Sequence, residues 1–145
     1  MVPIDLPGLL RNRYAAWPLA DHIADKVCAM LEGHPRQTGA AEPSTRYRDL
    51  ADLAIIAHRV EVDARRLRAA LAAEAVRRGL VLPEGLHEPA ATGWVAGYAR
   101  VARGVSGLEE KTLASALETL RRFIDPVLSG TAKGNWRKED LLWSW

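Results

Sequence analysis

The sequence contains a single cysteine, Cys28, so the chain cannot form an internal disulfide. Cys28 stands among apolar residues of an expected helix, where a small buried side chain is the ordinary outcome. No stretch is long and apolar enough to span a bilayer, and the region after Met1 lacks the basic start and apolar centre of a signal peptide. Together these absences predict a cytoplasmic protein in a reducing compartment.

Signals for zinc and for hydrolase chemistry are also missing. The histidines are scattered without the spacing of metal ligands, which predicts no metal site; they are His22, His34, His58 and His87. No order of serine, histidine and acid indicates a hydrolase. His22 lies near a group of charged residues, and we expect it to be a polar surface residue rather than a base.

The composition is that of one folded domain. A chain of 145 residues with 48% apolar and 26% charged residues can bury a moderate core and is not expected to be disordered. Its formal net charge of +2 is compatible with a nucleic-acid partner but does not require one.

Helical periodicity dominates the chain, and strand signals are nearly absent. We therefore expect an all-α fold, a bundle of about five helices with an irregular N-terminal arm. Residues 1–16 carry Pro3, Pro7 and Gly8 and form the expected extended arm, while residues 17–145 form the helical domain.

Residues suited to helix ends locate these five helices. Proline fits the first helical position, serine and aspartate cap free N–H groups, and glycine ends helices. The expected boundaries are Pro18 and Gly33 for the first helix, Ser44 for the start of the second, Asp63 and Gly79 for the third, Trp94 and Arg103 for the fourth, and a capping box of Ser106 and Glu109 for the fifth. We expect the terminal tryptophans to hold the tail against the core.

Arginines crowd the expected outer face of the third helix. They are Arg65, Arg66, Arg68, Arg77 and Arg78. Such a face could follow an RNA backbone, since each phosphate contact adds affinity, or it could be solvated helix surface. The sequence leaves both interpretations open.

Charged residues accompany the apolar stripes of the first two helices. Lys26 lies on the first, and the second carries Asp49 and Asp52, with Arg46 and Arg48 each one turn before an aspartate. If the helices pack antiparallel, Lys26 can approach the carboxylates. Lysine can neutralise phosphate oxygens, and a carboxylate can hold magnesium or accept a proton, as phosphoryl and nucleotidyl transfer require. The same residues could also form a structural ion pair.

Two segments carry a family resemblance. Asp21-His-Ile-Ala-Asp-Lys-Val-Cys-Ala-Met30 followed by Thr45-Arg-Tyr-Arg-Asp-Leu-Ala-Asp-Leu53 resembles the later motifs of the AbiEii/AbiGii nucleotidyltransferase toxins. In that family a helix with an Ala-(Glu/Asp)-Lys core precedes one that reads Arg-x-Lys-Asp-x-x-Asp-Leu.

The resemblance implies a toxin that acts with a separately encoded antitoxin in phage defence or growth control; some members add nucleotides to transfer RNA. By motif match, Lys26 takes the place of the family lysine that contacts the nucleotide phosphates, with Arg46 and Arg48 beside it. Asp49 takes the place of the aspartate that completes the site, and Asp52 is a further candidate. Arg48 stands where the family often has lysine, which keeps the charge but changes its geometry.

The chain departs from the family pattern at its first motif. That motif is a Gly-Ser followed by Asp-x-Asp or Asp-x-Glu, and this chain has no Gly-Ser dipeptide; its nearest acidic pair, Glu61 and Asp63, follows the second helix in the wrong order. Mg²⁺ and a nucleoside triphosphate are therefore expected only where a catalytic half is present, and not for this chain alone.

Three hypotheses follow. The chain is the C-terminal helical part of such a toxin, inactive alone, with the N-terminal arm as the remnant of a join to a missing domain. Alternatively, it is a stand-alone helical adaptor that binds nucleic acid or an acidic protein. In the third, it is a subunit that donates Lys26 and Asp49 to a separate catalytic chain. The expected partners are an antitoxin, transfer RNA or another RNA, or a separate catalytic domain, and no membrane.

Overall fold

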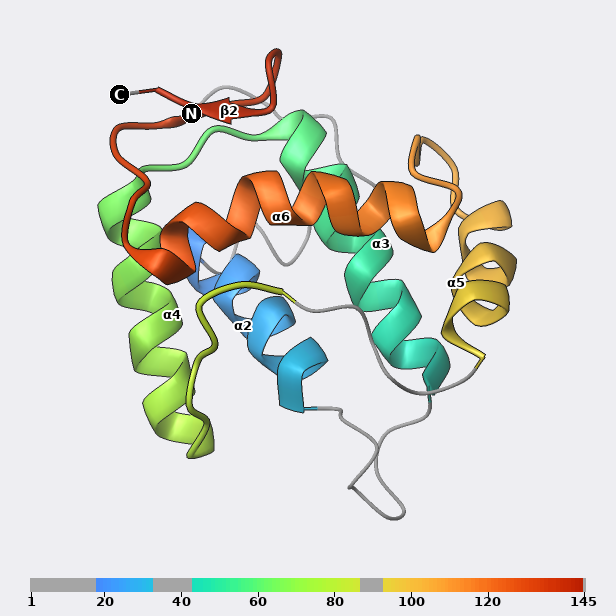
Figure 1. Ribbon diagram of the computed structural model, residues 1–145, viewed down its shortest axis with the longest axis horizontal. Helices are drawn as coiled ribbons and strands as arrows, with labels where there is room; N and C mark the ends of the chain where they lie inside the picture. Colours follow the sequence, from blue (N-terminus) through green and yellow to red (C-terminus); the bar gives the residue numbers. More distant parts are fainter. Residues whose placement is uncertain (1–17, 33–42, 87–92, 145) are drawn as a thin grey trace.

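The fold is all-α over the residues that the computed structural model describes, which are 18–32, 43–86 and 93–144 (Figure 1). These residues form α2 (Leu19–Glu32), α3 (Pro43–Arg59), α4 (Ala64–Arg78), α5 (Trp94–Arg103) and α6 (Leu113–Ser129), followed by a small hairpin of β1 (Trp136–Arg137) and β2 (Leu142–Trp143). The expected bundle of about five helices is confirmed. The expected N-terminal arm, residues 1–16, lies outside the described residues.

The central helix is α3. It contacts α2, α5 and α6, and Figure 1 shows it between α2 and α5 with α6 crossing it. Because helices pack against several sides of α3, its buried residues form more than one stripe. Seven residues in a row of eight are at most 2% exposed: Leu50, Ala51, Leu53, Ala54, Ile55, Ile56 and Ala57. The helix begins at Pro43, so the predicted start with Ser44 as N-cap is wrong. With Ser44 as N-cap the first helical residue would be Thr45; proline already has the φ angle of a first helical residue, and the helix starts two residues earlier.

The boundaries of α4 agree with the sequence. The Asp63 carboxylate accepts the N–H of Arg66 at 2.9 Å, and Gly79 ends the helix in a left-handed conformation with φ of 65°. α4 packs along α2, and Figure 1 shows the two helices side by side.

The start of α6 differs from the prediction. Thr112 is the N-cap, and its hydroxyl accepts the N–H of Ser115 while the Ser115 hydroxyl accepts the N–H of Thr112. The predicted capping box of Ser106 and Glu109 is wrong because Gly107, with φ of 82°, turns the chain between those two residues.

The C-terminal hairpin closes one side of the core. Trp136 is fully buried and donates its indole N–H to the Ala57 carbonyl at 2.7 Å, and Trp143 donates to the Phe123 carbonyl at 3.0 Å. The three rings pack against one another around Phe123. For these two tryptophans, the prediction that aromatic residues hold the tail is confirmed; Trp145 lies outside the described residues.

Candidate functional site

The two motif helices meet through a cluster of ion pairs. Lys26 Nζ lies 2.9 Å from Asp52 Oδ2 and 3.5 Å from Asp49 Oδ1. Arg46 lies 3.0 Å from the other oxygen of Asp49, one turn along α3. Lys26 therefore approaches both aspartates, as antiparallel packing of the two helices allows, and Arg46 pairs with Asp49.

This cluster is largely withdrawn from solvent. The Lys26 side chain is 6% exposed, and those of Asp49 and Asp52 are 13% and 19% exposed. Two cations face two carboxylates, so the charges balance within the cluster. Removal of Lys26 would leave the partly buried carboxylate of Asp52 without its cation, which is the costly case for buried ion pairs.

Burial dominates the electrostatics of Asp49. It raises the pKa of the Asp49 carboxyl above its ordinary value of 3.8, even though Lys26 and Arg46 pull that pKa down. The charged form of Asp49 is thus held at a free-energy cost. Sites that are kept for function are often held in this way, at some expense of stability.

His22 takes a different position from the one expected, whereas Arg48 lies at the surface. His22 is 1% exposed, so the prediction of a surface histidine is wrong; one turn before Lys26, it lies on the side of α2 that is packed into the bundle. Arg48 is exposed and lies beside the cluster rather than in it. Of the three residues matched to phosphate contact, the structure brings Lys26 and Arg46 together and leaves Arg48 at the surface.

The cluster does not by itself make a magnesium site. Both oxygens of Asp49 and one of Asp52 already face cations. Within the described part of the chain, no three His, Cys, Asp or Glu residues come close enough to share a metal ion. The residues of the cluster therefore do not fit Mg²⁺ without further ligands.

A second polar cluster was not found from the sequence. Glu110 is 5% exposed; its Oε2 atom lies 2.6 Å from His58 Nε2 and accepts the Thr119 hydroxyl at 2.7 Å. The Glu110 carbonyl accepts the Tyr98 hydroxyl at 2.7 Å. His58 and Glu110 are 52 positions apart, so no local sequence pattern predicts their contact. Through these contacts the buried Glu110 connects α3, α5 and α6.

Arg78 joins α2 to α4. It contacts Glu74 on its own helix, and Asp25 and Glu32 on α2, at 2.7, 2.8 and 2.6 Å. The prediction that Arg78 belongs to the outer arginine face is therefore wrong, whereas Arg65, Arg66 and Arg68 are exposed as expected. Because Asp25 precedes Lys26, this tie also fixes the segment of α2 that carries the lysine.

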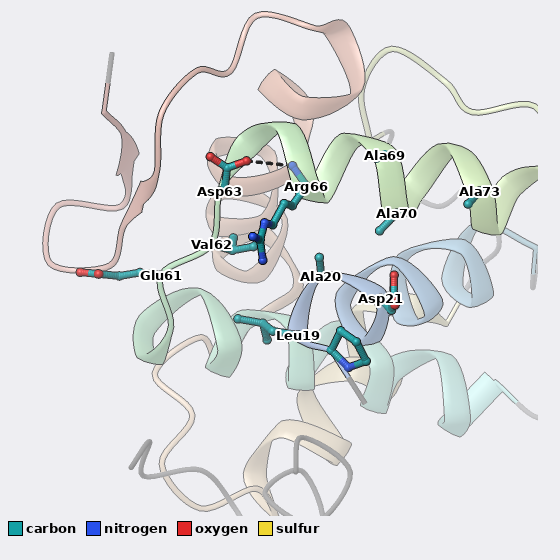
Figure 2. Close-up of a pocket in the computed structure, with 11 residues that line it drawn as sticks. Leu19, Ala20, Asp21, Glu61, Val62, Asp63, Arg66, Ala69, Ala70 and Ala73 are labelled. Carbon is teal, nitrogen blue, oxygen red and sulfur yellow. Dashed lines mark hydrogen bonds between the residues drawn. The ribbon is translucent and has the colours of Figure 1, made fainter. Parts of the chain in front are cut away.

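A cleft opens between the start of α2 and α4 (Figure 2). Its volume is about 820 Å³, and Figure 2 shows Ala20 of α2 and Ala70 of α4 pointing toward each other across it. The rim carries Asp21, Glu61, Asp63 and Arg66. None of the residues that form the Lys26 cluster lines this cleft, so the cleft and the cluster are separate features.

These observations define a helical domain whose two motif helices meet through a lysine and two aspartates. A family model described as the nucleotidyl transferase AbiEii toxin of type IV toxin–antitoxin systems matches residues 2–139. The chain belongs to this family. The match extends well beyond the two motif segments. Comparison with curated proteins and with solved structures finds no match. In the part of the chain that the structure describes, no helix has the length and apolar character needed to cross a bilayer.

Proposed function

We propose that this chain is the helical part of a nucleotidyltransferase-type toxin, in which Lys26 contacts the phosphates of a nucleotide and Asp49 and Asp52 complete the site. One observation carries the proposal. The two segments that match the family motifs lie on separate helices, and their charged residues converge to 2.9 Å. Loss of nucleotide binding in Lys26→Gln would distinguish such a site from an ion pair that only stabilises the fold.

The cluster suggests how Lys26 would act. An ammonium group has three donors, so Lys26 can hold Asp52 and turn a free donor toward a phosphate oxygen. The carboxylates keep the lysine charged and fix its position before the nucleotide arrives. Arg46 neutralises the charge of Asp49. Arg48, which is exposed, can add a contact to the phosphates from the solvent side.

We further propose that the chain alone does not transfer nucleotides. It has no Gly-Ser dipeptide to cradle phosphate, and its two cluster aspartates are occupied by cations. Mg²⁺ and a nucleoside triphosphate belong to the catalytic half that carries the first motif. That half would come from further sequence joined to this chain or from a separate subunit.

An incorporation assay tests the inactivity of the chain. The full chain is incubated with Mg²⁺, each α-labelled nucleoside triphosphate in turn, and total transfer RNA. We expect no label in RNA above the protein-free blank. Incorporation that disappears in Lys26→Gln would contradict inactivity and would support the assigned role of the lysine.

Nucleotide binding tests Lys26 directly. Titration of the full chain with a fluorescent ATP analogue should show weak binding that Lys26→Gln reduces. Lys138→Gln is the matched control, because Lys138 carries the same charge in the C-terminal hairpin and forms no ion pair with another described residue. Equal binding by both variants and the wild type would remove Lys26 from the proposal.

The partners follow from family membership. We propose a cognate antitoxin, an RNA substrate such as transfer RNA, a role in phage defence and a cytoplasmic location. Induction of the chain in a bacterial host, with and without the neighbouring genes, tests the first and third of these. The DNA around the coding region should also be read for a Gly-Ser and Asp-x-Asp segment, because finding it in frame or in an adjacent gene identifies the catalytic half.

A further inference from the structure

A second cleft lies at the start of α4, and its lining is basic. Its volume is about 460 Å³, and it is formed by the first turns of α4 and the segment after α6. Three cations line it: Arg65 and Arg68 from α4, and Lys133 from the other side. No residue of α2 or α3 takes part, so this site is separate from the Lys26 cluster and does not depend on the proposed function.

The cations of this cleft have no acidic partner among the described residues. Arg65 and Lys133 are exposed and form no ion pair or hydrogen bond with another described residue. Arginines elsewhere in the bundle do meet carboxylates, as Arg46 and Arg78 show. The basic cleft is thus left with a surplus of positive charge.

Asp63 does not remove this surplus. It is the one acidic residue lining the cleft, and one of its carboxylate oxygens accepts the N–H of Arg66 as the helix cap. With three cations against one carboxylate, the cleft carries a formal charge of +2. A concave surface of one sign concentrates its field and attracts ions of the opposite sign.

The Arg68 side chain lies against the segment that follows α6. Its guanidinium donates to the Ala132 carbonyl at 3.5 Å, and a Cβ on Gly130 would lie 3.8 Å from the same nitrogen. The side chain therefore rests against the end of α6 with donors left over. A guanidinium that is already positioned loses less freedom when it binds an anion.

We propose that this cleft binds a phosphate group through Arg65, Arg68 and Lys133. Arginine supplies paired donors that match phosphate oxygens, and lysine supplies a mobile charge from the opposite wall. The phosphate can come from the backbone of a nucleic acid or from a free phosphate ion, because both present the same anionic oxygens.

The test uses the full chain and two probes. A labelled single-stranded RNA of about twelve nucleotides is followed by fluorescence anisotropy over a range of salt, and inorganic phosphate is titrated alone and as a competitor. The test variant is Arg65→Gln/Lys133→Gln. The matched control is Arg100→Gln/Arg103→Gln, which removes two exposed charges from α5. Thermal melting checks that both variants stay folded.

We expect the test variant to weaken binding and to lower the slope of log K against log salt by about 1.4, since each contact to a single strand contributes about 0.7. Displacement of the RNA by millimolar phosphate identifies a site that holds a free ion as well; binding of RNA without such displacement identifies the nucleic-acid backbone as the source. The proposal is overturned if the wild type binds neither probe, if the test variant binds as the wild type does, or if the control loses as much.

Discussion

Lys26 and Asp52 are 26 positions apart, yet their side chains meet at 2.9 Å between α2 and α3, with Asp49 as a second carboxylate at 3.5 Å from the lysine. One cation thus serves two acids in a partly buried setting. This relationship makes opposite predictions for the loss of the lysine and the loss of an acid.

Loss of the lysine should destabilise the fold. Lys26→Met leaves Asp52 without its cation and Asp49 with Arg46 alone, so we expect the free energy of unfolding to fall by about 1–3 kcal/mol in urea titrations at pH 7. Lys138→Met is the control and should change little. A melting point that is unchanged or higher in Lys26→Met would show that the ion pairs do not stabilise the bundle.

Loss of Asp49 should have the opposite sign. Burial raises the pKa of Asp49 above 3.8 in the folded state. As the pH rises, the unfolded chain therefore loses the Asp49 proton at a lower pH than the folded chain does. The free energy of unfolding decreases as the pH rises through the interval between the pKa of Asp49 in the unfolded chain and its pKa in the folded chain. Asp49→Asn removes that decrease. Urea unfolding should find the variant at least as stable as the wild type at pH 7, with the difference shrinking toward about pH 3.5. A variant that is clearly less stable at pH 7 would contradict this sign.

The buried Glu110 should matter far more than its neighbour. Glu110→Ala leaves His58 and the Thr119 hydroxyl without their acceptor, and we expect a loss of about 1–3 kcal/mol in unfolding free energy. Glu109→Ala is the matched control, because the Glu109 side chain is 76% exposed. Similar small effects of both substitutions would show that the polar cluster inside α3, α5 and α6 carries no net stabilisation.

The contact between α3 and α5 leaves no room for a methyl group at Gly97. A Cβ there would meet the ring of Tyr47 well inside van der Waals distance, so Gly97→Ala should lower stability by about 1–3 kcal/mol despite the better helix propensity of alanine. Gly104→Ala is the control, since its nearest neighbour would be 3.7 Å away. Tyr47→Leu in the Gly97→Ala background should restore part of the lost stability. If it restores none, the clash is not with the Tyr47 ring.

Local signals predicted much of the helical framework. Asp63 and Gly79 bound α4 as expected, because capping depends on hydrogen bonds and φ angles within a few residues. The start of α6 was missed because Ser106–Glu109 and Thr112–Ser115 are similar local patterns, and the left-handed Gly107 decides between them. The two-residue strands of the hairpin are too short for any alternation to be visible.

The candidate site was predictable in part for a different reason. Lys26 and Asp49 could be paired because each lies on a strongly periodic helix, so one assumption of antiparallel packing brings them together. His58 and Glu110 could not be paired in this way, because Glu110 lies in an irregular segment before α6. The buried position of His22 was missed as well, since a histidine on an amphipathic helix gives no sign of how closely the next helix approaches.

The tail of the chain has a consequence for when the protein can fold. Trp136 is fully buried and donates its indole N–H to the carbonyl of Ala57, 79 positions earlier. During synthesis the helices emerge from the ribosome well before the residue that completes their packing. The packing of the helices is therefore complete only when the segment that carries Trp136 is also present, because this contact joins residues far apart in the sequence.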